Sequence, residues 1–183
     1  MHNKKVLLIN SPTLRNQYTS PDNYFPLGLL SLATVLSRAG IGAEVMDVNN
    51  DFYQKEFNED ILRGYIRDQI FPYIKDYAPD VIGIGCIFSG AFKSLKIIAE
   101  AIKAGHPGIP IVIGGIHATI FAREILEKYS FIDYVVVGEG EHTFPELLKS
   151  MFSENCAIDS IDGIAFRSEG TVKINPKTSF IEN

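Results

Sequence analysis

The sequence has few cysteines and no long apolar segment. Its 183 residues include two cysteines, Cys86 and Cys156, and neither has a metal-type partner at short spacing. A disulfide framework is therefore not expected, and a reducing compartment suits the chain. The apolar run nearest the N-terminus, residues 6–9, is too short for a signal peptide, and no run approaches the roughly 20 apolar residues of a membrane span. We expect a cytoplasmic protein that does not bind a membrane.

The sequence also lacks a cluster of basic side chains. It carries 17 Lys+Arg against 22 Asp+Glu, a formal net charge of −5, and the basic residues are spread along the chain. Proteins that follow a nucleic-acid backbone concentrate lysine and arginine on one surface. We therefore expect no nucleic-acid partner.

Several ligand-binding motifs are missing as well. No G-x-G-x-x-G follows the first apolar run, so the dinucleotide fingerprint is absent, and there is no Walker A sequence. A phospho-acceptor receiver needs an aspartate at the end of its third strand, where this chain has Gly85-Cys86-Ile87. Flavodoxin-type flavin binding needs a Ser/Thr-rich loop directly after the first strand, and the prolines and the length of "SPTLRNQYTS" fit that loop poorly.

The apolar segments that are present are short and mostly continuous. Such runs are typical of strands buried on both faces, as in a parallel sheet that is covered by helices. The five predicted strands cover residues 6–9, 45–48, 81–84, 111–113 and 134–137. Segments with helical spacing alternate with them, which predicts an α/β fold with a doubly wound five-stranded parallel sheet. The flavodoxin-like strand order 2-1-3-4-5 is the order we expect.

Five helices are predicted between and after these strands. They cover residues 26–40, 58–79, 92–105, 122–130 and 141–152. Pro72 lies inside the second helix and predicts a kink or a division there, because proline cannot donate the backbone hydrogen bond of a helix interior.

The C-terminal part of the sequence has a different pattern. Two short strands flank Ser168-Glu169-Gly170, which is a β-hairpin signal. After Pro176 the pattern fades and no closing element follows. We therefore divide the chain into a flavodoxin-like domain over residues 1–155, a C-terminal β-hairpin appendage over 156–176 and the start of a linker over 177–183.

The loops at one edge of the predicted sheet are candidate ligand-binding segments. Ligands of open parallel sheets bind beyond the carboxyl ends of the strands, near the point where the strand order reverses. The loops after the third, fourth and fifth predicted strands are rich in glycine and in small or hydroxyl residues, and they lead into helix N-termini with free N–H groups. The candidate binding residues are Ser11, Pro12, Leu27, Gly28, Gly85, Cys86, Ile87, Ser89, Gly114, Gly115, His117, Thr119, Gly138, Glu139, Gly140, Glu141 and Thr143.

Plainer roles compete with ligand binding at several of these positions. Glycines at strand ends often serve only tight turns. A buried, inert thiol is the commoner role for a cysteine such as Cys86. His117 stands at a helix start with no carboxylate or second histidine nearby in sequence, which favours a polar contact within a loop. An acid in a first helical turn, such as Glu141, commonly serves the helix dipole.

Five segments together resemble one known family. They are "FPLGLLSLATVLSRAGIGAEVMDV", "PDVIGIGC", "IPIVIGGIHAT", "IDYVVVGEGEHTFPELL" and "IDGIAFRSEG". In order and spacing they are similar to the N-terminal cobalamin-binding domain of cobalamin-dependent radical S-adenosylmethionine (SAM) enzymes, many of which are methyltransferases. The resemblance spans nearly the whole chain. It implies that residues 1–155 hold cobalamin and that a radical SAM domain, the partner that carries a 4Fe-4S cluster and SAM, follows in the same polypeptide.

The resemblance also has consequences for individual residues. Members of the wider fold carry Asp-x-His-x-x-Gly after the first strand, whose histidine ligates cobalt, and "SPTLRNQY" has no histidine. This difference implies that cobalamin binds base-off and without a histidine ligand. Leu14, Arg15 or Tyr18 would then line the lower face of the cofactor. Gly114-Gly115 matches a glycine pair of the fold. Ser89 is the candidate substitute for a serine of the fold that is replaced by glycine here.

No catalytic residue or metal ligand is assigned to this chain. Cys86 and Cys156 cannot form the Cys-x-x-x-Cys-x-x-Cys motif of a radical SAM domain, so we expect a fragment that is inactive alone. Two alternatives remain open. One is a ligand-free interaction module of the same fold, and the other is a flavin- or nucleotide-binding protein that uses residues 138–141.

Overall fold

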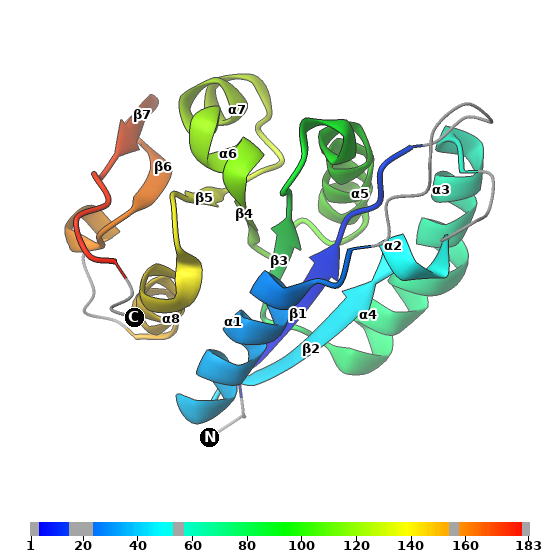
Figure 1. Cartoon of the computed structure of the whole chain (residues 1–183), viewed down its shortest axis with the longest axis horizontal. Helices are drawn as coiled ribbons and strands as arrows, with labels where there is room; N and C mark the ends of the chain where they lie inside the picture. Colours follow the sequence, from blue (N-terminus) through cyan, green and yellow to red (C-terminus); the bar gives the residue numbers. More distant parts are fainter. Residues whose placement is uncertain (1–3, 15–23, 53–56, 154–157, 181–183) are drawn as a thin grey trace.

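One continuous β-sheet runs through the described part of this computed structural model, which comprises residues 4–14, 24–52, 57–153 and 158–180 (Figure 1). Within these ranges the sheet has seven strands in the order β2-β1-β3-β4-β5-β6-β7. The strands are β1 (Lys5–Asn10), β2 (Gly42–Asp47), β3 (Val81–Gly85), β4 (Ile111–Gly114), β5 (Tyr134–Val136), β6 (Ile164–Ser168) and β7 (Thr171–Ile174). Neighbours among the first five strands pair in parallel, whereas β5–β6 and β6–β7 pair antiparallel. The predicted order 2-1-3-4-5 and the C-terminal hairpin are both confirmed.

Helices cover both faces of the sheet, as a doubly wound fold requires. α1 (Leu27–Arg38) and α8 (Gly140–Phe152) pack on one face, and Figure 1 shows them side by side there. The helices that contribute to the core on the other face are α2 (Val48–Asp51), α3 (Glu59–Tyr65), α4 (Phe71–Tyr77), α5 (Phe92–Gly105), α6 (Ile116–Ile120) and α7 (Ala122–Lys128). Within the described ranges, no helix has the length and apolar character that a bilayer crossing requires.

The central strands are continuous apolar runs because each face has its own core. The larger core lies under α2 to α7 and the smaller core under α1 and α8. In β3, Ile82 and Ile84 belong to the larger core and Val81 to the smaller core, and all three side chains are at most 2% exposed. Alternating residues of a strand point to opposite faces. A strand with helices on both sides therefore gains from apolar residues at every position, and this is the pattern that the sequence shows.

The helical segment around Pro72 is irregular, as its sequence predicts. α3 passes into a π-helical turn over Ile66–Ile70, in which the N–H of Phe71 donates to the carbonyl of Ile66, and then into α4. Pro72 lies in the first turn of α4. A π turn is a known way for a helix to accommodate an irregular position without ending.

The C-terminal hairpin extends the sheet. Glu169 and Gly170 form its turn with φ values of +51° and +76°, and β6 pairs with β5 through Val135 and Ala165. Val135 and Ala165 are fully buried. The sequence predicts the hairpin but not this pairing, because a turn signal does not reveal which strand edge the hairpin will cover.

Arg167 ties the hairpin to the end of α7. Its guanidinium donates from Nε to the carbonyl of Leu126 (2.9 Å), from Nη1 to that of Ile132 (2.7 Å) and from Nη2 to that of Tyr129 (2.7 Å). Carbonyls at a helix C-terminus lack intrahelical donors. A cation at this end of α7 also complements the helix dipole.

We predict that Arg167→Ala lowers the free energy of unfolding by about 2–3 kcal/mol, because hydrogen bonds to charged groups are worth more than neutral ones. Urea denaturation followed by circular dichroism measures this change. The control is Arg38→Ala, at an exposed position at the end of α1, which we expect to change the stability by less than about 0.5 kcal/mol. Equal effects of the two substitutions would contradict the role given to Arg167.

Candidate functional site

A cavity of about 230 Å³ lies at the carboxyl end of the sheet, between its central strands, α1 and α8. Gly83 and Gly85 of β3 and Gly114 of β4 are among its lining residues. These positions alternate with the isoleucines of the larger core, so their missing side chains would point toward α1 and α8. We call this cavity the glycine slot.

Glycines of β3 and β4 form part of the floor of the slot. A Cβ atom at Gly83 would lie 2.8 Å from Cδ2 of Leu8, and one at Gly85 would lie 3.3 Å from Cδ2 of Leu29. A Cβ at Gly114 would make only an ordinary contact with Val136, at 3.7 Å. Gly83 and Gly85 therefore let Leu8 and Leu29 lie close to the strand, whereas at Gly114 no clash within the protein requires glycine.

Gly115 is a glycine for a different reason from its neighbour. Its φ is +102°, and a Cβ there would lie 2.5 Å from the carbonyl oxygen of Cys86. The two loops are joined at this point, because the N–H of Cys86 donates to the carbonyl of Gly114 (2.8 Å) and the N–H of His117 donates to that of Cys86 (3.3 Å). Gly115 therefore permits close approach of two backbones, and Gly114 lines the cavity beside Val136.

The walls of the slot come from α1 and from the segment that leads into α8. Gly28, Leu29 and Leu32 line it from α1, and the segment Gly138–Glu141 with Phe144 lines it from the α8 side. Ser31 Oγ of α1 donates to Glu141 Oε1 of α8 at 2.9 Å and connects the two helices. Among the described residues that line the slot there is no lysine, arginine or histidine.

Ten of the seventeen predicted site residues line the slot. They are Gly28, Gly85, Cys86, Ile87, Gly114, Gly115, Gly138, Glu139, Gly140 and Glu141. The other seven lie outside it: Ser11, Pro12, Leu27, Ser89, His117, Thr119 and Thr143. The strand ends therefore meet at one edge, as their order predicts, but not every polar residue near them faces the slot.

Three of the outlying residues connect loops by hydrogen bonds. Ser11 Oγ donates to the carbonyl of Gly85 (2.8 Å), and the N–H of Gly138 donates to Thr119 Oγ1 (2.9 Å). Thr143 Oγ1 donates to the carbonyl of Asp162 at 2.8 Å. These hydroxyls hold in place the segments that form the slot.

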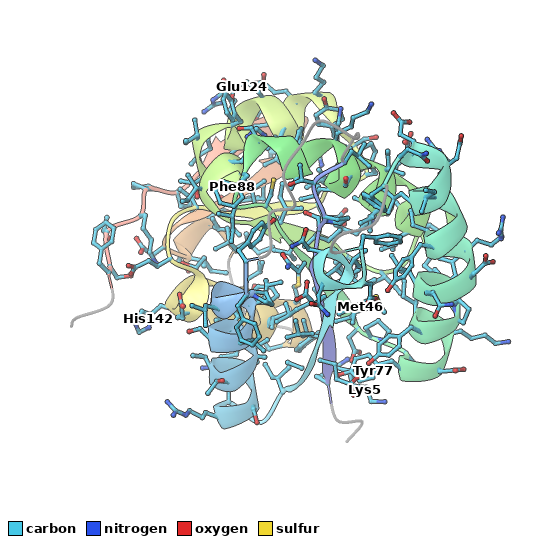
Figure 2. The ribbon with its side chains drawn as sticks, turned by 45° about the vertical axis from the view of Figure 1, so that its right-hand side comes forward. Lys5, Met46, Tyr77, Phe88, Glu124 and His142 are labelled. Atoms are coloured by element: carbon cyan, nitrogen blue, oxygen red, sulfur yellow. The ribbon has the colours of Figure 1, made fainter. Side chains whose placement is uncertain are left out.

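His117 makes the polar loop contact that its sequence position favours. Its Nδ1 lies 2.9 Å from Ser89 Oγ, and its ring centroid lies 4.6 Å from that of Phe92 and 4.8 Å from that of Phe121. Partial burial lowers the pKa of His117, which favours the neutral ring. Of the other described histidines, His106 follows α5 and His142 points outward from α8 (Figure 2).

Cys86 lines the slot but behaves as a buried thiol. It is fully buried, its Sγ lies 3.6 Å from the carbonyl oxygen of Phe88, and burial raises its pKa to about 12. A thiol with such a pKa is almost entirely protonated at neutral pH and is a poor nucleophile. Within the described ranges, no three His, Cys, Asp or Glu side chains are grouped as metal ligands.

Several slot residues were not predicted. The main ones are Leu8, Asn10, Leu29, Leu32 and Phe144. A signal for the first two was present, because Leu8 pairs with Gly83 and Asn10 with Gly85, and paired residues of neighbouring strands share a face. The helix residues carried no comparable signal, because helical spacing does not show which stripe faces a cavity.

Exposed apolar side chains surround this edge of the sheet. Phe25 is 70%, Leu27 69%, Phe88 50% and Ile116 63% exposed, and all four lie on segments that follow carboxyl ends of strands. We call these four residues the apolar rim. In Figure 2, Phe88 lies above the N-terminal end of α1. Large exposed apolar groups of this kind mark surfaces that bind a ligand or a partner.

Some predicted positions fall outside the described residues. These are Arg15, Tyr18, Cys156 and the domain boundary between residues 155 and 156. Leu14 is described, and it packs partly buried against the larger core.

Comparisons with known proteins agree with this geometry. The family model for the B12 binding domain matches residues 18–148. The chain is 31% identical over 186 residues to cytidylyl-2-hydroxyethylphosphonate methyltransferase of Streptomyces wedmorensis, covering 98% of this chain and 34% of that protein. It is 28% identical over 99 residues to the cobalamin-dependent radical SAM methyltransferase TokK of Streptomyces tokunonensis, covering 54% of this chain and 14% of that protein. The chain spans about a third of the length of the first curated relatives that it matches.

A solved structure has the same fold. The cobalamin-dependent S-adenosylmethionine radical enzyme OxsB, with aqua-cobalamin and S-adenosylmethionine bound, aligns with a TM-score of 0.72 and 24% identity. The alignment covers 98% of this chain and 23% of that one. At this identity the likeness concerns the fold alone.

The two adjacent glycines should respond differently to substitution. We predict that Gly115→Ala lowers the free energy of unfolding by about 2 kcal/mol or more, because alanine is strained at its positive φ and meets a backbone carbonyl. Gly114→Ala is the matched control, and we expect it to change the stability by less than about 1 kcal/mol. Guanidinium denaturation measures both, and a larger loss at Gly114 than at Gly115 would contradict this assignment.

Proposed function

The chain belongs to the B12-binding domain family and is a cobalamin-binding domain, and from this premise we propose that the glycine slot receives the nucleotide tail of cobalamin. One observation carries this proposal: a cavity whose lining includes Gly83, Gly85 and Gly114 lies between two helices at the edge where parallel sheets bind ligands. The nucleotide tail is long, narrow and partly flat. A cavity with glycines in its floor and apolar walls suits such a group.

The slot offers shape and backbone donors to the tail. No cationic side chain lines the slot within the described ranges, so the phosphate of the nucleotide tail would rely on backbone N–H groups. α8 begins at Gly140, and the first N–H groups of a helix lack partners within it. These groups and the helix dipole favour a phosphate near this end. The carboxylate of Glu141 accepts a hydrogen bond from Ser31 and is thereby held toward α1.

The apolar rim is the proposed support for the corrin ring. Phe25, Leu27, Phe88 and Ile116 expose much of their surface at the same edge as the slot. A corrin that covers them would remove this apolar surface from water, which is favourable. Cobalamin supplies a cobalt ion that can carry a methyl group, and the domain would orient it.

We further propose that cobalamin binds base-off and without a histidine ligand. The three described histidines do not line the slot, and His117 is held by Ser89 between two phenylalanine rings. His117 follows Ile116 of the apolar rim, but its Nδ1 is engaged by Ser89 and its ring by two phenylalanines, so we do not assign it to cobalt. A cobalt ion without such a ligand would lose its methyl group more readily.

For the whole protein we propose a cobalamin-dependent radical SAM enzyme of the methyltransferase type. The names of the relatives support this proposal, since two of them are methyltransferases and one of these is described as a radical SAM enzyme. The 4Fe-4S cluster and SAM would belong to a radical SAM domain in the same polypeptide. On this view the residues described here bind cobalamin and are inactive alone.

Binding is tested directly by mixing the 183-residue protein with hydroxocobalamin and separating the two by gel filtration. We expect the protein to keep a red, base-off corrinoid spectrum. Gly114→Val should weaken binding by about tenfold or more, because forcing side-chain volume into a closed space costs on the order of 1–3 kcal/mol. The control is Gly108→Val, at a glycine where an added Cβ would meet no atom within 4 Å, and this variant should bind like the wild type.

A colourless wild-type protein would reject the proposed function. If the protein instead bound FMN or a nucleotide tightly, the flavin- or nucleotide-binding alternative would be supported. If the protein bound neither cobalamin nor a flavin or nucleotide, the alternative of a ligand-free interaction module would be supported.

The absence of a histidine ligand has its own test. We predict that His117→Ala leaves the corrinoid spectrum unchanged, and that the wild-type spectrum stays constant between about pH 5 and pH 8, the range in which histidine ligands titrate. Absorption spectroscopy of the loaded protein measures both. A spectral change on substitution of His117, or a protonation step in this range, would contradict base-off binding without histidine.

A further inference from the structure

The segment after β7 folds back onto the domain. We call residues 175–179 the strap. The N–H of Asn175 donates to the carbonyl of Ile164 (2.8 Å), and the N–H of Gly163 donates to that of Pro176 (3.2 Å). Asn175 Nδ2 also donates to the carbonyl of Ile161 at 2.8 Å. The last residues of the predicted hairpin appendage, next to the predicted linker, are thus hydrogen bonded to β6 and to the loop that precedes it.

Asp162 anchors the strap through both of its carboxylate oxygens. Oδ1 accepts from the N–H and the hydroxyl of Thr178, both at 2.7 Å. Oδ2 accepts from the hydroxyl (2.7 Å) and the N–H (3.0 Å) of Ser179. These hydrogen bonds, that from the Ser179 hydroxyl first, hold the pKa of Asp162 far below its usual value. The carboxylate is therefore ionised at neutral pH and keeps all four donors.

Lys177 passes through a notch between two glycines. A Cβ atom at Gly163 would lie 2.6 Å from Lys177 Cδ, and one at Gly138 would lie 3.3 Å from Lys177 Cγ. Its side chain is only 6% exposed, and its Nζ donates to Thr143 Oγ1 at 2.9 Å and lies 3.5 Å from Asp162 Oδ2. Any larger residue at these glycines would close the notch.

The notch lies directly behind one wall of the slot. Gly138, which contacts the stem of Lys177, is also the first residue of the wall segment Gly138–Glu141. Gly138 has a φ of +76°, which glycine adopts at little cost. Because glycine can also adopt many other conformations, contacts from neighbouring residues are needed to hold this one. The wall is fixed from the α6 side by Thr119 and from the strap side by Lys177.

We propose that Lys177 is a positioning residue for the glycine slot, holding the segment Gly138–Glu141 in the conformation that leaves the slot open for cobalamin. The inference rests on the proposed function of that slot. It assigns a binding role to a residue that does not line the slot. Removal of the stem leaves the notch empty and lets Gly138 move, so the ligand must then order the wall as it binds.

Hydrogen exchange of the cobalamin-free protein tests this role without a ligand. In Lys177→Ala we expect the amides of residues 138–141, above all that of Gly138, which donates to Thr119 Oγ1, to exchange about tenfold faster than in the wild type, because exchange reports local opening. The matched control is Lys173→Ala, which removes an exposed lysine of β7 that pairs with Asp159 and should leave these amides unchanged. Unchanged exchange in Lys177→Ala, or an equal rise throughout the chain, would overturn the inference.

Cobalamin affinity gives the second readout. Titration should show a dissociation constant about threefold to tenfold higher for Lys177→Ala than for the wild type, the scale expected for ordering a few residues on binding. Wild-type protein that binds, with an equal constant for Lys177→Ala, would overturn the positioning role and leave the proposed function intact. Wild-type protein that does not bind would reject the proposed function, while the exchange result would still decide whether Lys177 holds the wall.

A second variant covers the case in which Lys177→Ala does not fold. Thr143→Val is nearly isosteric and removes the hydroxyl that accepts from Lys177 and donates to Asp162. We expect the amides of residues 138–141 to exchange faster than in the wild type here as well, by a smaller factor than in Lys177→Ala. If Thr143→Val folds and leaves these amides as protected as in the wild type, the inference fails.

Discussion

The glycine positions Gly83, Gly85 and Gly114 of β3 and β4 are the constraint on which the rest of the domain depends. Glycine inside a strand is less stable than alanine by roughly 0.5–1 kcal/mol, and here Gly83 and Gly85 stand in one strand. The opposite face compensates, because Ile82, Ile84 and Ile113 are at most 2% exposed and belong to the larger core. At their carboxyl ends these strands are thus held mainly from one side, and α1 and α8 can flank a cavity on the other.

The polar residues near the slot serve mainly to keep its parts in register. Ser11 joins the loop after β1 to the end of β3, and Thr119 joins α6 to the loop after β5. Each uses a short side chain with few rotamers, so little conformational entropy is lost when it is fixed. A site made of glycine floors and backbone donors needs such connections, because its lining residues contribute few polar contacts of their own. The slot is therefore shaped by residues one layer away from it.

The sheet was predictable because each buried strand has a local signature, a short continuous apolar run. The edge at which a ligand binds followed from strand order, which brought Gly85, Gly114 and Gly138 together as expected. The sequence could not separate Gly114 from Gly115, since the difference lies in a backbone conformation and in the distant carbonyl of Cys86. Nor could it reveal the strap, because Asp162 and Asn175 hold it by hydrogen bonds that have no periodic pattern.

The pairing of β6 with β5 also bears on how the domain behaves among other copies of itself. β5 is a strand of three residues, Tyr134–Val136, and without the hairpin its backbone would be open to any extended segment. Unpaired strand edges promote aggregation, and natural proteins blunt them with short strands and lysine. The outer strand that takes its place, β7, has four residues and carries Lys173, which is engaged with Asp159. The hairpin therefore replaces an apolar margin with a short, charged one that resists edge-to-edge association.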